Sequence, residues 1–319
     1  MLFKLLKIPA KLSLPLYCRN LSIQNKKFLS HPGPLLIACN HPNSFLDAII
    51  LATLFDKPIY SLARGDAFKN KFISRILHTL NILPVYRISE GAENLSANYD
   101  TFAQCREIFK KNGIVLIFSE GLCINEWKLR ALKKGTARLA FSSWQEGIDL
   151  TILPAGINYH SFKSFGKNIQ LNFGTPFGKE AFDHQNLDGM GIKAFNEKLK
   201  NELMTLVEVI EPHDKEKLKS TFEITHSSAK KKLLFIPSVL GKWVHAPFYF
   251  PLKKFTTKAA DKSDHYDSVL VGLLFMLYPV YLFAIAFLIY LWMGSWVGLL
   301  GFLIFPLLAW SFVQLKKQH

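Results

Sequence analysis

The feature that most constrains this chain is a long stretch without a single charged side chain, which covers residues 268–315. A helix that crosses a bilayer needs about 20 predominantly apolar residues, so the stretch is long enough for two spans. We predict helices over Val269–Trp292 and Trp296–Leu315, joined by a turn at Met293-Gly294-Ser295. A buried hairpin in a soluble core is the alternative, but so long an uncharged stretch is typical of a transmembrane hairpin.

Positive charge surrounds this stretch, and the whole chain carries a formal charge of +15. Lysines lie on both sides of it: Lys253, Lys254, Lys258 and Lys262 before, Lys316 and Lys317 after. Because lysines favour the cytoplasmic side, we expect a membrane protein whose remaining domain lies on the cytoplasmic face. An anionic partner is expected on charge alone. Since most of the 27 phenylalanines lie in apolar runs rather than beside lysines, membrane lipids are favoured and nucleic acid is not.

The N-terminus has a second membrane-related pattern. Met1–Leu14 places Lys4, Lys7 and Lys11 along one helical face, with apolar side chains around the rest. A signal peptide would need an apolar core that these lysines do not interrupt. The segment is typical of an amphipathic helix at the membrane surface. A plain surface helix remains the alternative, because Pro9 weakens a helix here.

Between these segments, short apolar runs alternate with helical patterns, which predicts an α/β domain with a partly parallel sheet flanked by helices. Strands are expected at Leu35–Cys39, Pro58–Ala63, Ile82–Tyr86, Ile114–Phe118, Leu150–Leu153, Ile157–Tyr159 and Ile169–Phe173. Helices are expected at Ser44–Phe55, Asn70–Leu80, Asn98–Lys111, Lys134–Glu146 and Phe195–Val209.

The composition divides the chain into four parts. Residues 1–20 form the amphipathic segment and residues 21–210 the α/β domain. Residues 211–267 are a basic linker or membrane-surface segment that prolines break, and residues 268–315 are the hairpin. The four cysteines lie at scattered spacings, which favours free thiols over a disulfide framework or a metal site.

Polar residues follow several of the predicted strands. His41 and Asp47 lie six positions apart, so a loop can bring one ring nitrogen of His41 onto the carboxylate and leave the other as a base. Taken alone, an ordinary capping pair explains this spacing as well. Arg87 ends a strand and is either a surface arginine or an anion clamp. Glu120-Gly121 follows the clearest strand, where glycine permits a tight turn.

The order of these groups is more specific than any one of them. The series His41–Asp47, Arg87, Phe118–Gly121 and Leu153–Pro154 resembles the four ordered blocks of the glycerolipid acyltransferase family. This family includes the lysophosphatidate and glycerol-3-phosphate acyltransferases. The resemblance covers about Leu21 to Pro176.

This resemblance implies an O-acyltransferase of phospholipid biosynthesis that works without an acyl-enzyme intermediate. His41 would be the general base and Asp47 would hold and stabilise its imidazolium. Arg87 would bind an acidic headgroup of the acceptor. The donor, acyl-CoA or acyl carrier protein, is a substrate, and no further cofactor is implied.

Further residues receive expected roles from the same resemblance. Glu120 and Gly121 would shape the acceptor site. Lys133 and Lys134 would meet phosphates of the thioester carrier.

The chain departs from the family pattern at two places. The first block has one residue more than the common H-x4-D, and Cys123 stands where the third block usually has an arginine. Arg130 would replace that arginine, or the acceptor carries no glycerol phosphate, in which case a lyso-aminoacyl lipid is the alternative. His184, His213 and His265 also lie close to an aspartate, but no apolar strand leads into them.

Other functional classes fit less well. A serine hydrolase of the nucleophile-elbow type needs G-x-S-x-G, which does not occur. Lys134-Gly135-Thr136 lacks the glycine spacing of a phosphate-binding loop. A non-catalytic basic membrane adaptor is the alternative from another class, and the presence of both His41 and Asp47 argues against it.

Overall fold

A computed structural model describes residues 2–86, 97–182, 188–294 and 296–317. Its centre is a seven-stranded sheet with the strand order β1-β7-β6-β2-β5-β3-β4. Strands β6, β2, β5, β3 and β4 are parallel to one another, whereas β7 is antiparallel to β6, and β1 pairs with β7 in parallel. The partly parallel sheet that the sequence predicts is therefore confirmed. The strands are β1 (Cys18–Gln24), β2 (Leu35–Cys39), β3 (Ile59–Arg64), β4 (Ile82–Val85), β5 (Ile114–Phe118), β6 (Thr151–Tyr159) and β7 (Lys167–Phe173).

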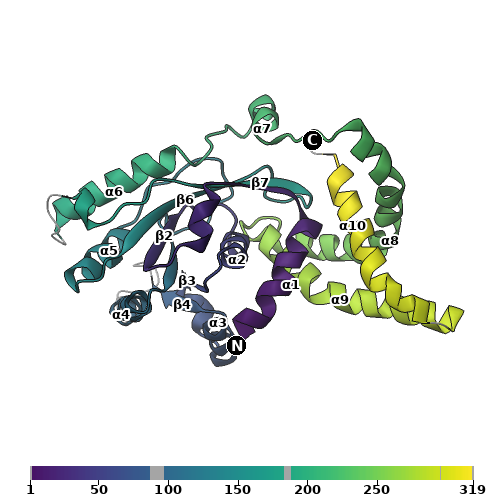
Figure 1. Ribbon diagram of the computed structural model, residues 1–319, viewed down its shortest axis with the longest axis horizontal. Helices are drawn as coiled ribbons and strands as arrows, with labels where there is room; N and C mark the ends of the chain where they lie inside the picture. The colour runs from purple at the N-terminus through teal and green to yellow at the C-terminus, as the bar shows by residue number, and fades with distance from the viewer. Residues whose placement is uncertain (1, 87–96, 183–187, 295, 318–319) are drawn as a thin grey trace.

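Helices cover both faces of this sheet, as Figure 1 shows. Alternate side chains of a strand point to opposite faces, so Ile37 and Leu116 pack on one face and Leu36 and Val115 on the other. The first face is covered by α1, α2 and the beginning of α9, and the second by α4, α5 and α6. The helices are α1 (Leu2–Tyr17), α2 (Phe45–Leu54), α3 (Lys71–Thr79), α4 (Ala97–Lys110), α5 (Gly135–Gln145), α6 (Gly189–Met204), α7 (Lys215–Phe222), α8 (Ser228–Ala260), α9 (Tyr266–Met293) and α10 (Gly301–Leu315).

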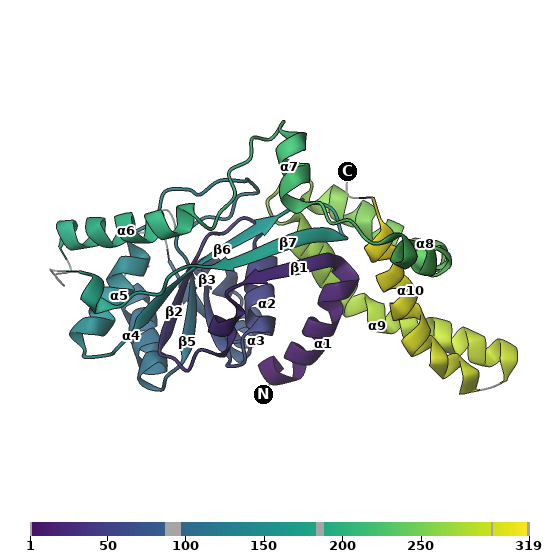
Figure 2. The same cartoon turned by 45° about the horizontal axis from the view of Figure 1, so that its top comes forward.

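The C-terminal helices α9 and α10 project from the α/β domain side by side, and the chain returns to the domain at its end (Figures 1 and 2). Among the described residues, two segments are long and apolar enough to cross a membrane: Tyr266–Met293, with a mean hydropathy of 2.4, and Val297–Leu315, with 1.9. The predicted pair of apolar helices is confirmed in length and composition. The second one begins with a short 3-10 helix, Trp296–Leu300.

Several expectations about single elements were wrong. The strand β1 was not predicted, and the two short strands expected around Pro154 are one continuous strand, β6. Residues 211–267, expected to be a basic linker or membrane-surface segment that prolines break, consist largely of α7 and α8. Helix α8 continues through Pro237, Pro247 and Pro251. It is strongly curved (Figure 1), as proline kinks would produce, and it packs against α10.

Candidate active site

The candidate site lies where three neighbouring parallel strands end. His41 follows β2, Glu120 follows β5, and Tyr159 is the last residue of β6. The carboxyl ends of parallel strands lie at the same edge of a sheet, which is the usual position of binding sites in α/β folds. Three segments that are distant in the sequence therefore meet there.

The two predicted catalytic side chains are in direct contact. His41 Nδ1 lies 2.9 Å from Asp47 Oδ2. Asp47 is fully buried in the first turn of α2, whereas the His41 side chain keeps 18% of its surface exposed. An ionised carboxylate can only accept hydrogen bonds, so Nδ1 carries the proton of a neutral imidazole. This leaves Nε2 unprotonated, as a general base requires.

Two further donors reach the Asp47 carboxylate. The Asn43 backbone N–H donates to Oδ2 at 2.9 Å, and the Tyr159 hydroxyl donates to Oδ1 at 2.6 Å. Burying a carboxylate is costly unless donors replace the lost water, and three donors do so here. Burial and the neighbouring Asp47 charge raise the pKa of Tyr159 well above its usual range, so this hydroxyl keeps its proton at neutral pH. Sequence patterns had not identified Tyr159 or Asn43.

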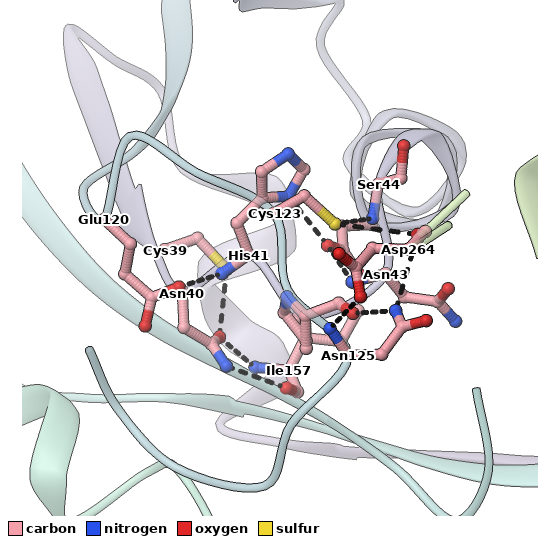
Figure 3. Close-up of polar contacts among 12 residues, drawn as sticks. Cys39, Asn40, His41, Asn43, Ser44, Glu120, Cys123, Asn125, Ile157 and Asp264 are labelled. Atoms are coloured by element: carbon pink, nitrogen blue, oxygen red, sulfur yellow. Dashed lines mark hydrogen bonds and ion pairs between the residues drawn. The ribbon is translucent and has the colours of Figure 1, made fainter. Parts of the chain in front are cut away.

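The imidazole ring of His41 is also held in its plane. The Phe118 ring, at the end of β5, stacks on it with a centroid distance of 3.8 Å and an interplanar angle of 12°. In Figure 3 the ring points away from Asn40 and Glu120, while the His41 backbone lies between them. Rotation of the His41 side chain is therefore restrained by two contacts: Phe118 stacks on one face of the ring, and Asp47 contacts Nδ1.

Glu120 acts on this loop through backbone groups. Its Oε2 accepts the His41 N–H at 2.9 Å, and its Oε1 accepts the Arg130 N–H at 2.8 Å. Burial raises the pKa of the Glu120 carboxyl, and the two N–H donors oppose this shift. Gly121 has a φ of +65°, which lets the chain turn immediately after Glu120. The acceptor-site role expected for Glu120 stays a prediction, because both of its oxygens already have protein donors.

Asn40 joins two of the strands at this edge. Its amide donates to the Ile157 carbonyl at 3.1 Å and accepts the Ile157 N–H at 2.8 Å. These two bonds connect the end of β2 to β6 in the manner of a backbone pair (Figure 3). Asn40 directly precedes His41 in the sequence. Unlike a surface asparagine, it is buried.

Most of the basic residues that were predicted to bind substrate lie on a surface next to the His41–Asp47 pair. The side chains of Lys133 and Lys134 are exposed, and Arg130 forms an ion pair with Glu126 at 2.8 Å. A cavity of about 480 Å³ is lined by Arg130 and Lys134 together with residues of α6, including two more lysines, Lys193 and Lys200. His41 does not line this cavity, so the basic surface is beside the His41–Asp47 pair rather than around it.

Arg87, the predicted acceptor clamp, lies outside the described residues. The structure describes the chain up to Tyr86, whose backbone N–H and carbonyl both bond to the Asn98 side chain, at 2.7 and 2.8 Å. Cys123, at the family's arginine position, is described: its sulfur lies 3.0 Å from the Ser44 nitrogen and accepts that N–H. Cys123 is therefore part of the packing around the His41 loop.

A comparison with protein-family models agrees with these motifs. The family model described as Acyltransferase matches residues 20–158, which contain His41, Asp47 and Glu120. Among solved structures, the chain is similar to the 1-acyl-sn-glycerophosphate (LPA) acyltransferase PlsC from Thermotoga maritima, with 12% sequence identity, a TM-score of 0.45, and coverage of 64% of this chain and 77% of that chain. No curated protein sequence matches the chain. Residues 20–158 therefore match an acyltransferase domain, and the ordered motifs predicted from the sequence lie within them.

Proposed function

We propose that this protein transfers a fatty-acyl group from an acyl thioester to the hydroxyl of a glycerol-3-phosphate or lysophosphatidate-type acceptor at a membrane surface. His41 is the general base and Asp47 its partner. The observation that carries the proposal is the 2.9 Å contact between His41 Nδ1 and the buried Asp47 carboxylate within the acyltransferase domain.

The reaction balances with these two side chains. As the acceptor oxygen attacks the thioester carbonyl carbon, its proton passes to Nε2 of His41, and Asp47 stabilises the resulting imidazolium. The tetrahedral intermediate then collapses, the carbon–sulfur bond breaks, and the leaving thiolate takes the proton from His41. The ester and a free thiol are the products, and the transfer needs neither a metal nor a redox cofactor.

The donor is expected at the basic surface beside this pair. Acyl-CoA and acyl carrier protein both bring phosphate groups, and Lys133, Lys134 and Arg130 offer three cationic groups near the Glu120 turn. Lys193 and Lys200 extend this surface along α6. Either donor therefore fits the charge of the surface, and a direct comparison of the two as substrates decides between them.

The proposed location is a membrane with the catalytic domain on its cytoplasmic face. Helix α9 and the segment Val297–Leu315, which ends with α10, have the length and hydropathy of membrane spans, and both ends of the hairpin are flanked by lysines. The positive charges favour the cytoplasmic side for both ends. Lipids would then reach the site from the leaflet in which they reside.

The base is tested by His41→Ala in the full-length protein, with free thiol release as the readout. Loss of a general base lowers the rate by about 10²–10⁴-fold. The matched control is His213→Ala, because His213 is exposed and also precedes an aspartate, and it should keep the wild-type rate. Near-normal turnover in a folded His41→Ala variant would contradict the mechanism, and no thiol release by wild type with any acceptor would favour the membrane adaptor.

A second acceptor class is favoured by one residue. Cys123 replaces an arginine of the family pattern, and two arginines suit a phosphate dianion, whereas one suits a single negative charge such as a carboxylate. A lyso-aminoacyl lipid is therefore the second candidate. An acceptor panel of glycerol-3-phosphate, lysophosphatidate and a lyso-aminoacyl lipid separates the classes. Within it, Arg87→Ala should raise the KM of the acceptor about ten- to hundredfold and change that of the donor far less.

A further inference from the structure

The beginning of the membrane hairpin contacts the loop that carries His41. We call residues 40–44 the catalytic loop, and residues 264–267, between the end of α8 and the first turn of α9, the junction. Three junction side chains bond to the site: Asp264 accepts the Asn125 N–H at 2.9 Å, His265 Nδ1 lies 2.7 Å from Ser44 Oγ, and Asp267 Oδ2 accepts the Asn43 amide at 2.7 Å. Figure 3 shows Asp264 beside Asn125 and Cys123.

Asp267 is a buried charge with several partners. Its carboxylate is fully buried and forms an ion pair with the equally buried Lys167 of β7. The Tyr17 hydroxyl donates to Oδ1 at 2.6 Å, and the Asn43 amide donates to Oδ2. A buried charge that is paired and hydrogen-bonded has one favourable position, because any displacement leaves a charge unpaired. Asp267 therefore fixes the Asn43 side chain in space.

Asn43 connects this buried charge to the proposed active site. Its side chain donates to Asp267, while its backbone N–H donates to Asp47 Oδ2, the same oxygen that lies 2.9 Å from His41 Nδ1. A continuous chain of contacts therefore runs from α9 through Asn43 and Asp47 to the ring of His41.

The next residue of the catalytic loop has an unusual backbone. Ser44 has φ 54° and ψ −133°, a combination that side chains disfavour and that persists only where surrounding contacts hold it. Two contacts do so: its N–H donates to Cys123 Sγ at 3.0 Å, and its hydroxyl bonds to His265. One of these two contacts again comes from the junction.

A membrane anchor alone does not need these contacts. A carboxylate in the first turn of a helix is favourable in any case, because the helix dipole is positive there. That explanation accounts for the sequence position of Asp267 but not for its burial, its pairing with Lys167 or its bond to Asn43. The contacts join the hairpin to the loop that follows β2, 224 positions earlier in the chain.

We propose that the junction is a positioning element of the active site, in which Asp267 acts through Asn43 and His265 acts through Ser44. The inference rests on the proposed role of His41 and Asp47. The hairpin thus completes the catalytic loop in addition to anchoring the chain. Cys123 belongs to the same group of contacts, because its sulfur accepts the Ser44 N–H at 3.0 Å and donates to the Asp264 carbonyl of the junction at 3.8 Å.

Asn43→Ala in the full-length, detergent-solubilised protein tests the first contact. The variant keeps the backbone N–H to Asp47, and Asp267 keeps Lys167 and Tyr17, so the fold should persist. Within the described residues the Asn43 Oδ1 atom has no hydrogen-bond partner, so its removal relieves a buried polar atom. We expect kcat to fall at least about tenfold, since a small misplacement of reacting groups has effects of this size, with both KM values and the melting temperature near wild type.

The matched control is Asn172→Ala in β7, whose side-chain amide donates to the Leu206 carbonyl at 3.1 Å. It should lower the melting temperature slightly and leave kcat unchanged. If Asn43→Ala keeps the wild-type kcat while His41→Ala is inactive, the positioning role is wrong and the proposed function stands. If His41→Ala is also active, the proposed function itself fails.

The second contact is tested at His265, which is exposed and whose replacement should not disturb folding. His265→Ala should lower kcat about two- to tenfold through loss of the bond to Ser44. His265→Asn offers an amide group near the position of Nδ1 and should restore part of that loss. Equal kcat in all three proteins would exclude His265 from positioning.

Discussion

At the scale of single residues, the Asp47 carboxylate is the centre of the site, because three donors from two different parts of the chain meet on it. His41 and Asn43 come from the loop after β2, and Tyr159 comes from the end of β6. The sequence pairs only His41 with Asp47. The Tyr159 contribution depends on the register of β6, which places its hydroxyl under α2.

Tyr159→Phe removes one donor and leaves the ring in place. A hydrogen bond to a charged group contributes about 1.5–3 kcal/mol, so kcat should fall by roughly ten- to hundredfold if the whole amount is used in orienting His41. Steady-state thiol release measures this, with the melting temperature as the folding control. An unchanged kcat would show that His41 and Asn43 hold Asp47 without Tyr159.

Glu120→Gln separates charge from hydrogen bonding at the same edge. Burial raises the pKa of Glu120 above its ordinary value of 4.5 in the folded state, so the folded protein binds a proton more tightly than the unfolded chain does. The contribution of this group to stability is then greatest below pH 4.5 and is lost as pH rises through the folded-state pKa. The unfolding free energy of wild type relative to Glu120→Gln should therefore decrease from pH 4 to pH 7.

Denaturant unfolding at the two pH values measures this difference. Glutamine keeps one acceptor oxygen and presents an NH₂ group to the other N–H donor, so the variant should also be less active. If the wild type instead became more stable relative to Glu120→Gln as pH rises, the two N–H donors would lower the pKa of Glu120 more than burial raises it.

At the scale of elements, the turn after β5 determines where Glu120 and Arg130 meet. Gly121 has φ +65°, and a Cβ placed on it would lie 2.9 Å from Lys133 Cγ. Gly121→Ala should therefore destabilise the protein by about 1 kcal/mol or more and also lower activity. Thermal unfolding and thiol release measure the two effects.

Two other glycines separate the causes. Gly147 has φ +76° and nothing within 4 Å of an added Cβ, so Gly147→Ala tests backbone strain without a clash. Gly189, at the start of α6, has neither a contact nor an unusual φ, so Gly189→Ala should be neutral or stabilising. Equal effects of all three substitutions would exclude a special role for the Gly121 turn.

At the scale of the whole molecule, the hairpin and its lysine borders should make the chain an integral membrane protein. We expect the full-length protein to stay in the membrane fraction after washing with high salt and with alkaline carbonate, since burial of α9 and α10 does not depend on ionic strength. Lys253→Gln combined with Lys254→Gln is the matched control, because both side chains are exposed, and it should resist extraction equally. Release of the wild-type protein by salt alone would show that only charge holds it.

The sequence by itself determined the parts of this protein that local pattern encodes. The strands Leu35–Cys39 and Ile114–Phe118 were predicted with their observed bounds, because both are fully apolar runs with a helix stop or a polar turn beside them. The apolar hairpin followed from the absence of charge over residues 268–315. The ordered motifs placed His41, Asp47 and Glu120 together because parallel strands end at one edge.

Only the tertiary structure decided what surrounds those residues. The strand β1 has a mixed sequence and forms because β7 offers an unpaired edge, and α8 remains one helix through three prolines because it packs against α10. His265 and Asp267 look like polar residues before a membrane segment, yet they contact the loop that holds His41. Their partners are more than 200 positions away, and a hydrogen bond between such segments depends on the packing of whole helices and strands, which no local sequence pattern records.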